Sequence, residues 1–200
     1  MDIDPKDVVG TAEEAARETN NSRLNSAVAV AVALLATFMG ICKVKDDNIV
    51  QGMQQAQADK IDHWAYYQAR NLREELAKAT VVQLRLQADD RPPERRAAYA
   101  QEIAHYETLA KEQSAKKEEL RVQAGKDQQT YDALNFRDDQ FDLSDALIAI
   151  AISLLALTSL TRLWWLFMLS MAPAGFGVLM GLAGLLGWAL HPGALVKLLS

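Results

Sequence analysis

The side chains that could carry out chemistry are few in this chain and scattered along it. The histidines are His63, His105 and His191, and the one cysteine is Cys42. A metal site needs several such ligands close together, as in an HExxH helix or in paired Glu-x-x-His motifs from two helices, and neither pattern occurs. A glycine-rich phosphate loop and a nucleophile elbow are also missing. The sequence therefore predicts a protein that is not an enzyme and has no metal or cofactor.

Two other groups have a functional and a plain interpretation. The carboxylates of Asp89-Asp90-Arg91 could form a catalytic acid pair, but they lie beside a predicted helix break and fit a solvated turn better. A single cysteine cannot form an intrachain disulfide, so Cys42 is interpreted as a small apolar residue at a helix end.

The most distinctive motif in the polar part of the chain is an aromatic cluster with the sequence His63-Trp64-Ala65-Tyr66-Tyr67-Gln68-Ala69-Arg70. On a helix Trp64 and Tyr67 share one side, whereas Tyr66 points elsewhere. The cluster is either a packing knot inside the protein or a contact surface between subunits, where Trp and Tyr are favoured anchors. We predict Trp64, Tyr66 and Tyr67 as interaction residues.

The residues described so far lie between, beside or at the end of three apolar runs, which are Leu24–Cys42, Leu143–Leu160 and Trp164–Leu190. A helix of roughly 20 apolar residues crosses a bilayer core, and the only charged residue in these runs is Asp145. The first 23 residues are acidic on balance, which favours an uncleaved anchor over a signal peptide. The sequence predicts an all-α membrane protein with three transmembrane helices.

The second and third runs are separated by Thr161-Arg162-Leu163. A continuous helix would place Arg162 inside the membrane, at a cost of about 2.5–3.5 kcal/mol, so a tight turn is predicted. The third run contains the small-residue pair Gly177 and Gly181, which allows two helix backbones to approach closely. These glycines either pack against the chain's own first or second span or form a seam between subunits, and they join the predicted interaction residues.

The polar middle, Lys43–Asp142, is rich in Ala, Gln, Glu, Lys and Arg, a composition that favours helix. Arg91-Pro92-Pro93 breaks it near its centre, so a long antiparallel, coiled-coil-like hairpin between the first two spans is predicted. In this hairpin the residue opposite His63 is expected near Arg121.

Apolar spacing predicts which face of each arm is buried. The returning arm has a 3-4 register at Ile103, Tyr106, Ala110, Leu120, Ala124, Tyr131, Leu134 and Phe141, interrupted by Gln113, Lys117, Asp127 and Asp138. The outgoing arm has one at Ala65, Ala69, Leu72, Leu76, Ala79 and Leu86, interrupted by Gln83. Alanine-rich seams bury little area, so we expect the arms to need further partners.

These features divide the chain into successive segments. They are a polar acidic tail (1–23), a first transmembrane helix (24–42), an extramembrane hairpin with its turn at 91–93 (43–142), a second transmembrane helix (143–160), a tight turn (161–163), a third transmembrane helix (164–190) and a C-terminal tail (191–200).

The distribution of basic residues predicts the topology. Lys6, Arg17, Arg23 and Arg162 lie on one side and Lys197 on the other, which places the N-terminus in the cytoplasm and the hairpin in the periplasm. Lys43 and Lys45, next to the first span, argue for the opposite orientation.

Several of these motifs resemble those of an uncharacterised bacterial membrane-protein family, catalogued as domain of unknown function four-three-three-seven. The resemblance rests on Trp64, on Tyr66–Arg70, on Phe141-Asp142-Leu143 and on Leu160-Thr161-Arg162 followed by Trp164, and it covers roughly Ser22 to Leu190. The resemblance implies a fold and a membrane location, and it supplies no activity or catalytic residues. We predict a multi-pass protein of the bacterial inner membrane.

The leading functional hypothesis is a non-enzymatic scaffold that associates with itself through the hairpin. The alternative is an accessory subunit of a transporter or another membrane complex. The expected partners are the lipid bilayer, further copies of the chain and an unidentified membrane protein. A net charge of −5 with no basic stripe argues against nucleic acid.

Overall fold

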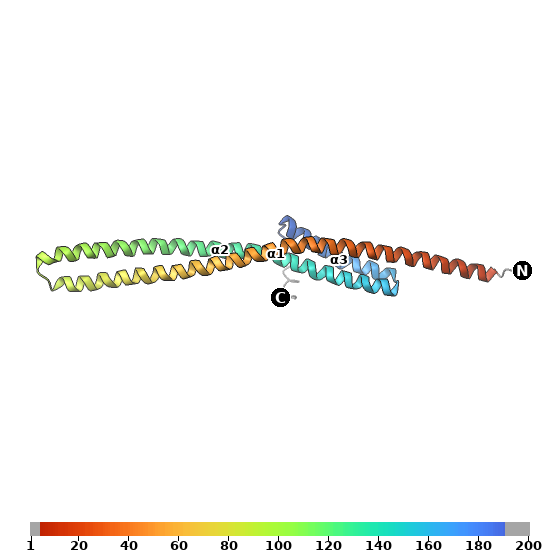
Figure 1. The fold of residues 1–200 in the computed structure, drawn as a ribbon, viewed down its shortest axis with the longest axis horizontal. Helices are drawn as coiled ribbons and strands as arrows, with labels where there is room; N and C mark the ends of the chain where they lie inside the picture. The colour runs from red at the N-terminus through yellow and green to blue at the C-terminus, as the bar shows by residue number, and fades with distance from the viewer. Residues whose placement is uncertain (1–4, 191–200) are drawn as a thin grey trace. The chain divides into compact units, whose positions relative to one another are not determined.

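The computed structural model describes the backbone of residues 5–190 and the side chains of residues 18–190. It contains three helices, α1 (Pro5–Asp89), α2 (Pro93–Thr161) and α3 (Trp164–Leu186), which Figure 1 shows in chain order from red to blue. No strand occurs in the described part of the chain. The predicted all-α fold is therefore confirmed.

The break between α1 and α2 consists of residues 90–92. The Arg91 amide donates to the Ala88 carbonyl at 3.1 Å, and the Arg95 amide donates to the Pro92 carbonyl at 3.0 Å. Pro93 is the first residue of α2, a position where the missing amide hydrogen costs nothing because helix N-termini leave it unpaired. The prolines thus end one helix and start the next, one residue earlier than the turn expected at 91–93.

The break between α2 and α3 is shorter. Arg162 has a left-handed φ of 59°, and Leu163 precedes the first turn of α3. At its other end α3 stops at Leu186, because Gly187 takes a left-handed φ of 70° and caps the helix. The third apolar run is thus helical over 164–186 rather than to Leu190. The predicted C-terminal tail, with His191 and Lys197, lies outside the described residues.

The contacts divide the chain into two units. The first, which we call the helix pair, is Gln51–Leu134 and holds the C-terminal half of α1 and the N-terminal half of α2. In it the two helices lie side by side and antiparallel (Figure 1). The other, which we call the three-helix unit, combines the chain up to Val50 with the chain from Asn135.

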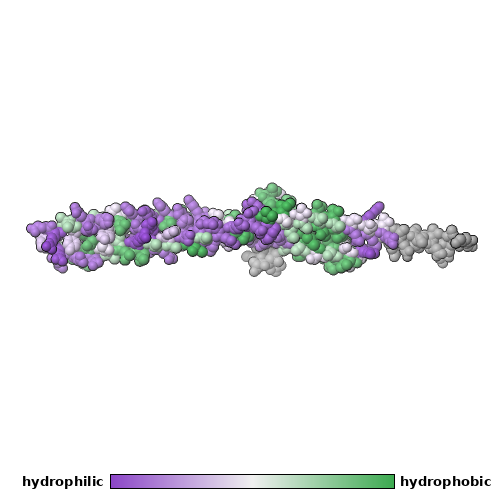
Figure 2. Space-filling view, viewed as in Figure 1, coloured by the Kyte–Doolittle hydropathy of each residue, from purple (hydrophilic) through white to green (hydrophobic). Residues whose placement is uncertain are grey.

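The three-helix unit has an apolar core to which all three helices contribute. Its buried residues include Leu24, Val28 and Leu35 of α1, Ile148 and Leu155 of α2, and Ala174 of α3. Figure 2 shows that apolar side chains also gather on its surface, whereas the surface of the helix pair is mainly hydrophilic.

Each helix contains a stretch that is long and apolar enough to cross a membrane by length and composition.

Candidate interaction surfaces

The α2 side of the helix pair follows the predicted register. The predicted seam residues of this helix are all buried or half-buried: Ile103, Tyr106, Ala110, Leu120, Ala124, Tyr131 and Leu134. The polar residues that interrupt the seam, Gln113, Lys117 and Asp127, are buried or half-buried as well. The prediction for this arm is confirmed, including its polar interruptions.

The α1 side does not follow the predicted register. The residues expected to face α2 are all exposed: Ala65, Ala69, Leu72, Leu76, Ala79 and Leu86, which we call the outer stripe. A second set lies against α2 instead and is buried or half-buried: His63, Tyr67, Arg70, Glu74, Ala77 and Val81, which we call the inner stripe. At about 100° per residue the two stripes lie on nearly opposite sides of α1.

Polar pairs explain why the inner stripe faces α2. His63 Nδ1 lies 2.6 Å from Asp127 Oδ2. Arg70 Nη1 donates to Gln113 Oε1 at 2.9 Å. The partner of His63 is thus Asp127, so the prediction of Arg121 was wrong by six positions along α2.

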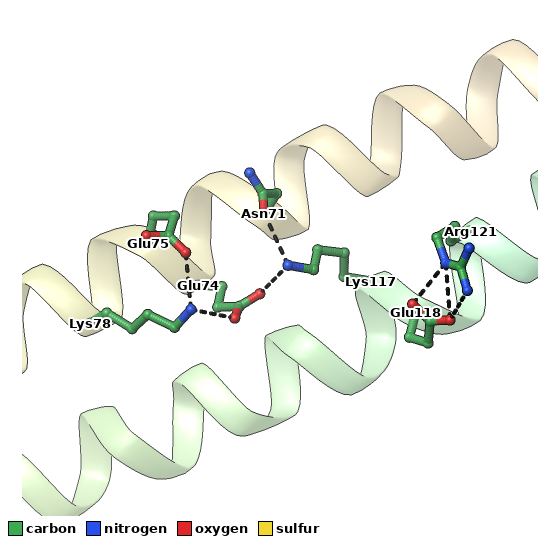
Figure 3. A network of polar contacts seen from close by, with 7 residues as sticks. All are labelled: Asn71, Glu74, Glu75, Lys78, Lys117, Glu118 and Arg121. Atoms are coloured by element: carbon green, nitrogen blue, oxygen red, sulfur yellow. Dashed lines mark hydrogen bonds and ion pairs between the residues drawn. The ribbon is translucent and has the colours of Figure 1, made fainter.

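A larger polar network lies further along the seam (Figure 3). Glu74 contacts Lys117 of α2 at 2.6 Å and Lys78 of its own helix at 2.7 Å. Lys117 also donates to Asn71 Oδ1 at 3.0 Å. The hydrogen bond from Lys117, with that from Lys78, holds the pKa of the buried Glu74 carboxyl below its usual range.

The alternative register would be costly for electrostatic reasons. If Leu72 and Leu76 faced α2, Lys117 and Asp127 would lose Glu74 and His63 as partners. Removing one partner of a buried charge costs several kcal/mol, roughly 3–5 for fully buried pairs, which is of the same order as the roughly 1.5–3 kcal/mol gained by burying each leucine. The face of α1 that is observed against α2 is the one that pairs these polar groups, and the more apolar face stays uncovered.

The aromatic cluster is divided between the two stripes. Trp64 and Tyr67 meet edge to face with ring centroids 5.2 Å apart, as predicted. The ammonium group of Lys117 lies 5.9 Å from the centroid of the Tyr67 ring. Tyr66 is exposed and lies between the two stripes, about 100° around the helix from Ala65. Only part of this cluster is thus engaged within the chain.

The glycines of α3 pack within the three-helix unit. A β-carbon on Gly177 would lie 2.8 Å from Ile148 Cγ1, and one on Gly181 would lie 2.6 Å from Phe38 Cε1. The Ser144 hydroxyl donates to the Gly177 carbonyl at 2.8 Å. Of the two interpretations offered by the sequence, contact with the chain's own first and second apolar segments is the one observed.

An acidic group where α1 and α2 meet in the three-helix unit was not identified from the sequence. Asp46 is buried and accepts a hydrogen bond from Lys43 Nζ at 2.8 Å. Burial, together with a hydrogen bond to Asp46 and the charge of Asp142, raises the pKa of Asp138 to about 6. The signal in the sequence was Asp138, which interrupts the predicted α2 seam.

Within the described residues, no group of three or more His, Cys, Asp or Glu side chains is arranged to hold a metal ion. Neither His63 nor His105 belongs to such a group: His63 pairs with Asp127, and the His105 ring meets the Tyr106 ring edge to face. The described residues leave two apolar surfaces uncovered, the outer stripe and the exterior of the three-helix unit.

Comparison with known proteins places the chain in a family. A family model described as "Domain of unknown function (DUF4337)" matches residues 24–187, so the chain belongs to this family. No curated protein and no solved structure matches the chain.

Proposed function

We propose that this family member is a non-enzymatic integral membrane protein that acts as a self-associating scaffold. Three transmembrane helices anchor it, and the antiparallel helical hairpin between the first and second is its interaction module. In this proposal the protein functions by forming a homo-oligomer and does not catalyse a reaction. The inner membrane of a bacterium is the location that we propose.

The apolar exterior of the three-helix unit supports the membrane part of this proposal. Large apolar side chains are exposed on all three of its helices, among them Val30 and Leu34 of α1, Leu157 and Leu160 of α2, and Met168 and Phe176 of α3. A contiguous apolar surface of this kind is unfavourable in water and favourable against lipid.

The outer stripe is the observation that carries the scaffold proposal. The helix pair satisfies its own polar groups along the inner stripe and leaves the more apolar side of α1 uncovered. A solvent-exposed helix of a monomer normally has its polar residues on that side. An uncovered apolar side on a helix that is already paired indicates a further helix partner.

Purification in a mild detergent tests the proposal. We expect light scattering at micromolar concentration to give the mass of a homo-oligomer, with no second protein in stoichiometric amount. A monodisperse monomer would contradict the scaffold function. A stoichiometric membrane partner would instead favour the accessory-subunit alternative.

The proposed orientation has the N-terminus in the cytoplasm and the hairpin in the periplasm. Alkaline phosphatase fused after residue 90 is then expected to be active, since the enzyme needs an oxidising compartment. A stably expressed but inactive fusion would reverse the orientation and leave the scaffold proposal intact.

A further inference from the structure

We infer that the outer stripe of α1 is the seam on which a second copy of this chain packs, α1 against α1, in parallel and in register. This inference rests on the proposed function, because it names the surface and the geometry of the self-association. The partner copy would contribute the same stripe, so the interface is two-fold symmetric.

The spacing of the stripe requires a helix as its partner. Its apolar residues, together with Gln83, fall at positions 65, 69, 72, 76, 79, 83 and 86, so that steps of four and three residues alternate throughout. This is the spacing of residues that interlock with a second helix of the same repeat. If this side of the helix pair faced only water, no contact would depend on such a regular apolar spacing.

The exposed area is sufficient for a specific contact. The stripe and the positions beside it expose large apolar side chains by 58–67%: Ile61, Tyr66, Leu72, Leu76, Val82 and Leu86. At roughly 60–80 Å² each, two copies would bury on the order of 1,000 Å² once the alanines are included, near the size at which specific interfaces become stable.

The charges around the stripe favour another protein helix over a membrane surface. Between 61 and 86 the basic residues are Arg70, Arg73, Lys78 and Arg85, and the acidic ones are Asp62, Glu74 and Glu75. A helix that lies on anionic lipid is instead strongly basic on its polar side. The charges here nearly balance, so lipid headgroups would gain little from this face.

The α2 surface gives a reason for contact through α1 alone. Along the middle of its outer side α2 exposes charged residues, among them Lys111, Glu112, Lys116, Glu119 and Lys126. Covering these would cost desolvation without burying apolar area. The helix pair thus offers one apolar side, and a second copy offers the matching one.

Parallel packing follows from the common anchor. Two copies inserted with the same topology run α1 in the same direction. Leu72, Leu76 and Leu86 would then each meet their counterparts, and the small side chains of Ala65, Ala69 and Ala79 would allow close approach. The flanking contacts would be Glu75 with Thr80 and Gln68 with Arg73, so no like charges meet. A Gln83 layer would oppose slippage, as buried amides do in paired helices.

Disulfide trapping in the full-length protein tests the seam. In a Cys42→Ala background, Leu76→Cys places one thiol on the outer stripe and Lys116→Cys places one on the exposed side of α2. After oxidation in detergent or membranes, we expect most of the Leu76→Cys protein, and little of the Lys116→Cys protein, to migrate as a covalent dimer.

The possible results distinguish a failure of the proposed α1–α1 seam from a failure of the proposed self-association. If the parent protein has an oligomeric mass but Leu76→Cys is not trapped, or is trapped no better than Lys116→Cys, the seam is wrong and self-association stands. If the parent protein is monomeric, both fail. As a second readout, Leu72→Glu with Leu76→Glu should lower the oligomeric mass to that of the monomer with helix content unchanged, because both leucines are exposed in the single chain.

Discussion

The helix pair and the three-helix unit are built from the same two long helices, yet they pack in opposite ways. In the helix pair the seam is polar and specific, with Glu74 bonded to Lys117 and His63 bonded to Asp127. In the three-helix unit the contact is steric, with Gly177, Gly181 and Gly184 accepting large side chains from the neighbouring helices. The comparison indicates that polar pairing determines how the helices pack in the helix pair, whereas close contact at glycines determines it in the three-helix unit.

The physical reason is the composition of each stretch. Each helix of the three-helix unit also exposes large apolar side chains, so apolarity alone does not select one face, and close backbone approach at small residues does so instead. In the helix pair charged and polar residues interrupt the α2 seam, so the side of α1 that faces α2 is the one that pairs with them. Three predictions test this contrast, from the largest expected effect to the smallest.

The steric contact predicts a large effect at Gly181. A β-carbon there would lie 2.6 Å from Phe38 Cε1 and 2.8 Å from Ser144 Oγ, so Gly181→Ala should destabilise the three-helix unit by about 1–3 kcal/mol. Thermal unfolding in detergent, followed by circular dichroism, measures the loss.

Gly175→Ala is the matched control in the same helix, because a β-carbon at Gly175 meets nothing within 4 Å. It should be neutral or slightly stabilising, since Ala has the better helix propensity. Equal losses of stability in both variants would show that close helix packing at Gly181 does not stabilise the three-helix unit.

The polar seam predicts an intermediate effect at Glu74. Glu74→Gln keeps the size of the side chain but removes the charge between Lys117 and Lys78, and it should cost on the order of 1–2 kcal/mol. The exposed end of Lys78 remains solvated, which keeps the loss below that of a fully buried pair. Chemical denaturation of the protein in detergent measures it.

Glu118→Gln is the control drawn in the same view (Figure 3). Glu118 pairs with Arg121 of its own helix on the exposed surface, and such pairs contribute little. If Glu118→Gln proved as costly as Glu74→Gln, the polar seam would have no special role.

The smallest effects concern pH, and the two regions should respond with opposite signs. The pKa of Asp138 is raised from 3.8 to about 6 in the folded protein, so the folded state binds this proton more tightly than the unfolded state. The stability of the three-helix unit should therefore fall as pH rises from about 4 to 6. Asp138→Asn should weaken this dependence without abolishing it, because burial also raises the pKa of Asp142.

The pKa of Glu74 is lowered below 4.5, so its contribution is present above that pH and is lost as pH falls through the folded-state value. Unfolding temperatures of the parent, Asp138→Asn and Glu74→Gln proteins across the acidic range measure both slopes. If the two substitutions changed the slope of the parent protein in the same direction, the contrast between the regions would be contradicted.

Much of the architecture was predictable because it depends on local chemistry. Paired prolines cannot continue a helix, so Pro92 and Pro93 marked the break between α1 and α2, and the composition of both sides excluded strands. The α2 register could also be identified, because this helix has one good seam and its opposite side is charged. The end of α3 at Gly187 was missed, although a glycine near the end of an apolar run is a common helix cap.

The sequence by itself therefore determined the helices, their main break and the buried side of α2. Only the tertiary structure decided which side of α1 faces α2, because α1 carries two stripes and the more apolar one, with Leu72 and Leu76, is not the one used. Apolar spacing records what a helix gains by burial. It does not record the cost of leaving Lys117 and Asp127 of the opposite helix without partners, and that cost exists only once the two helices are side by side.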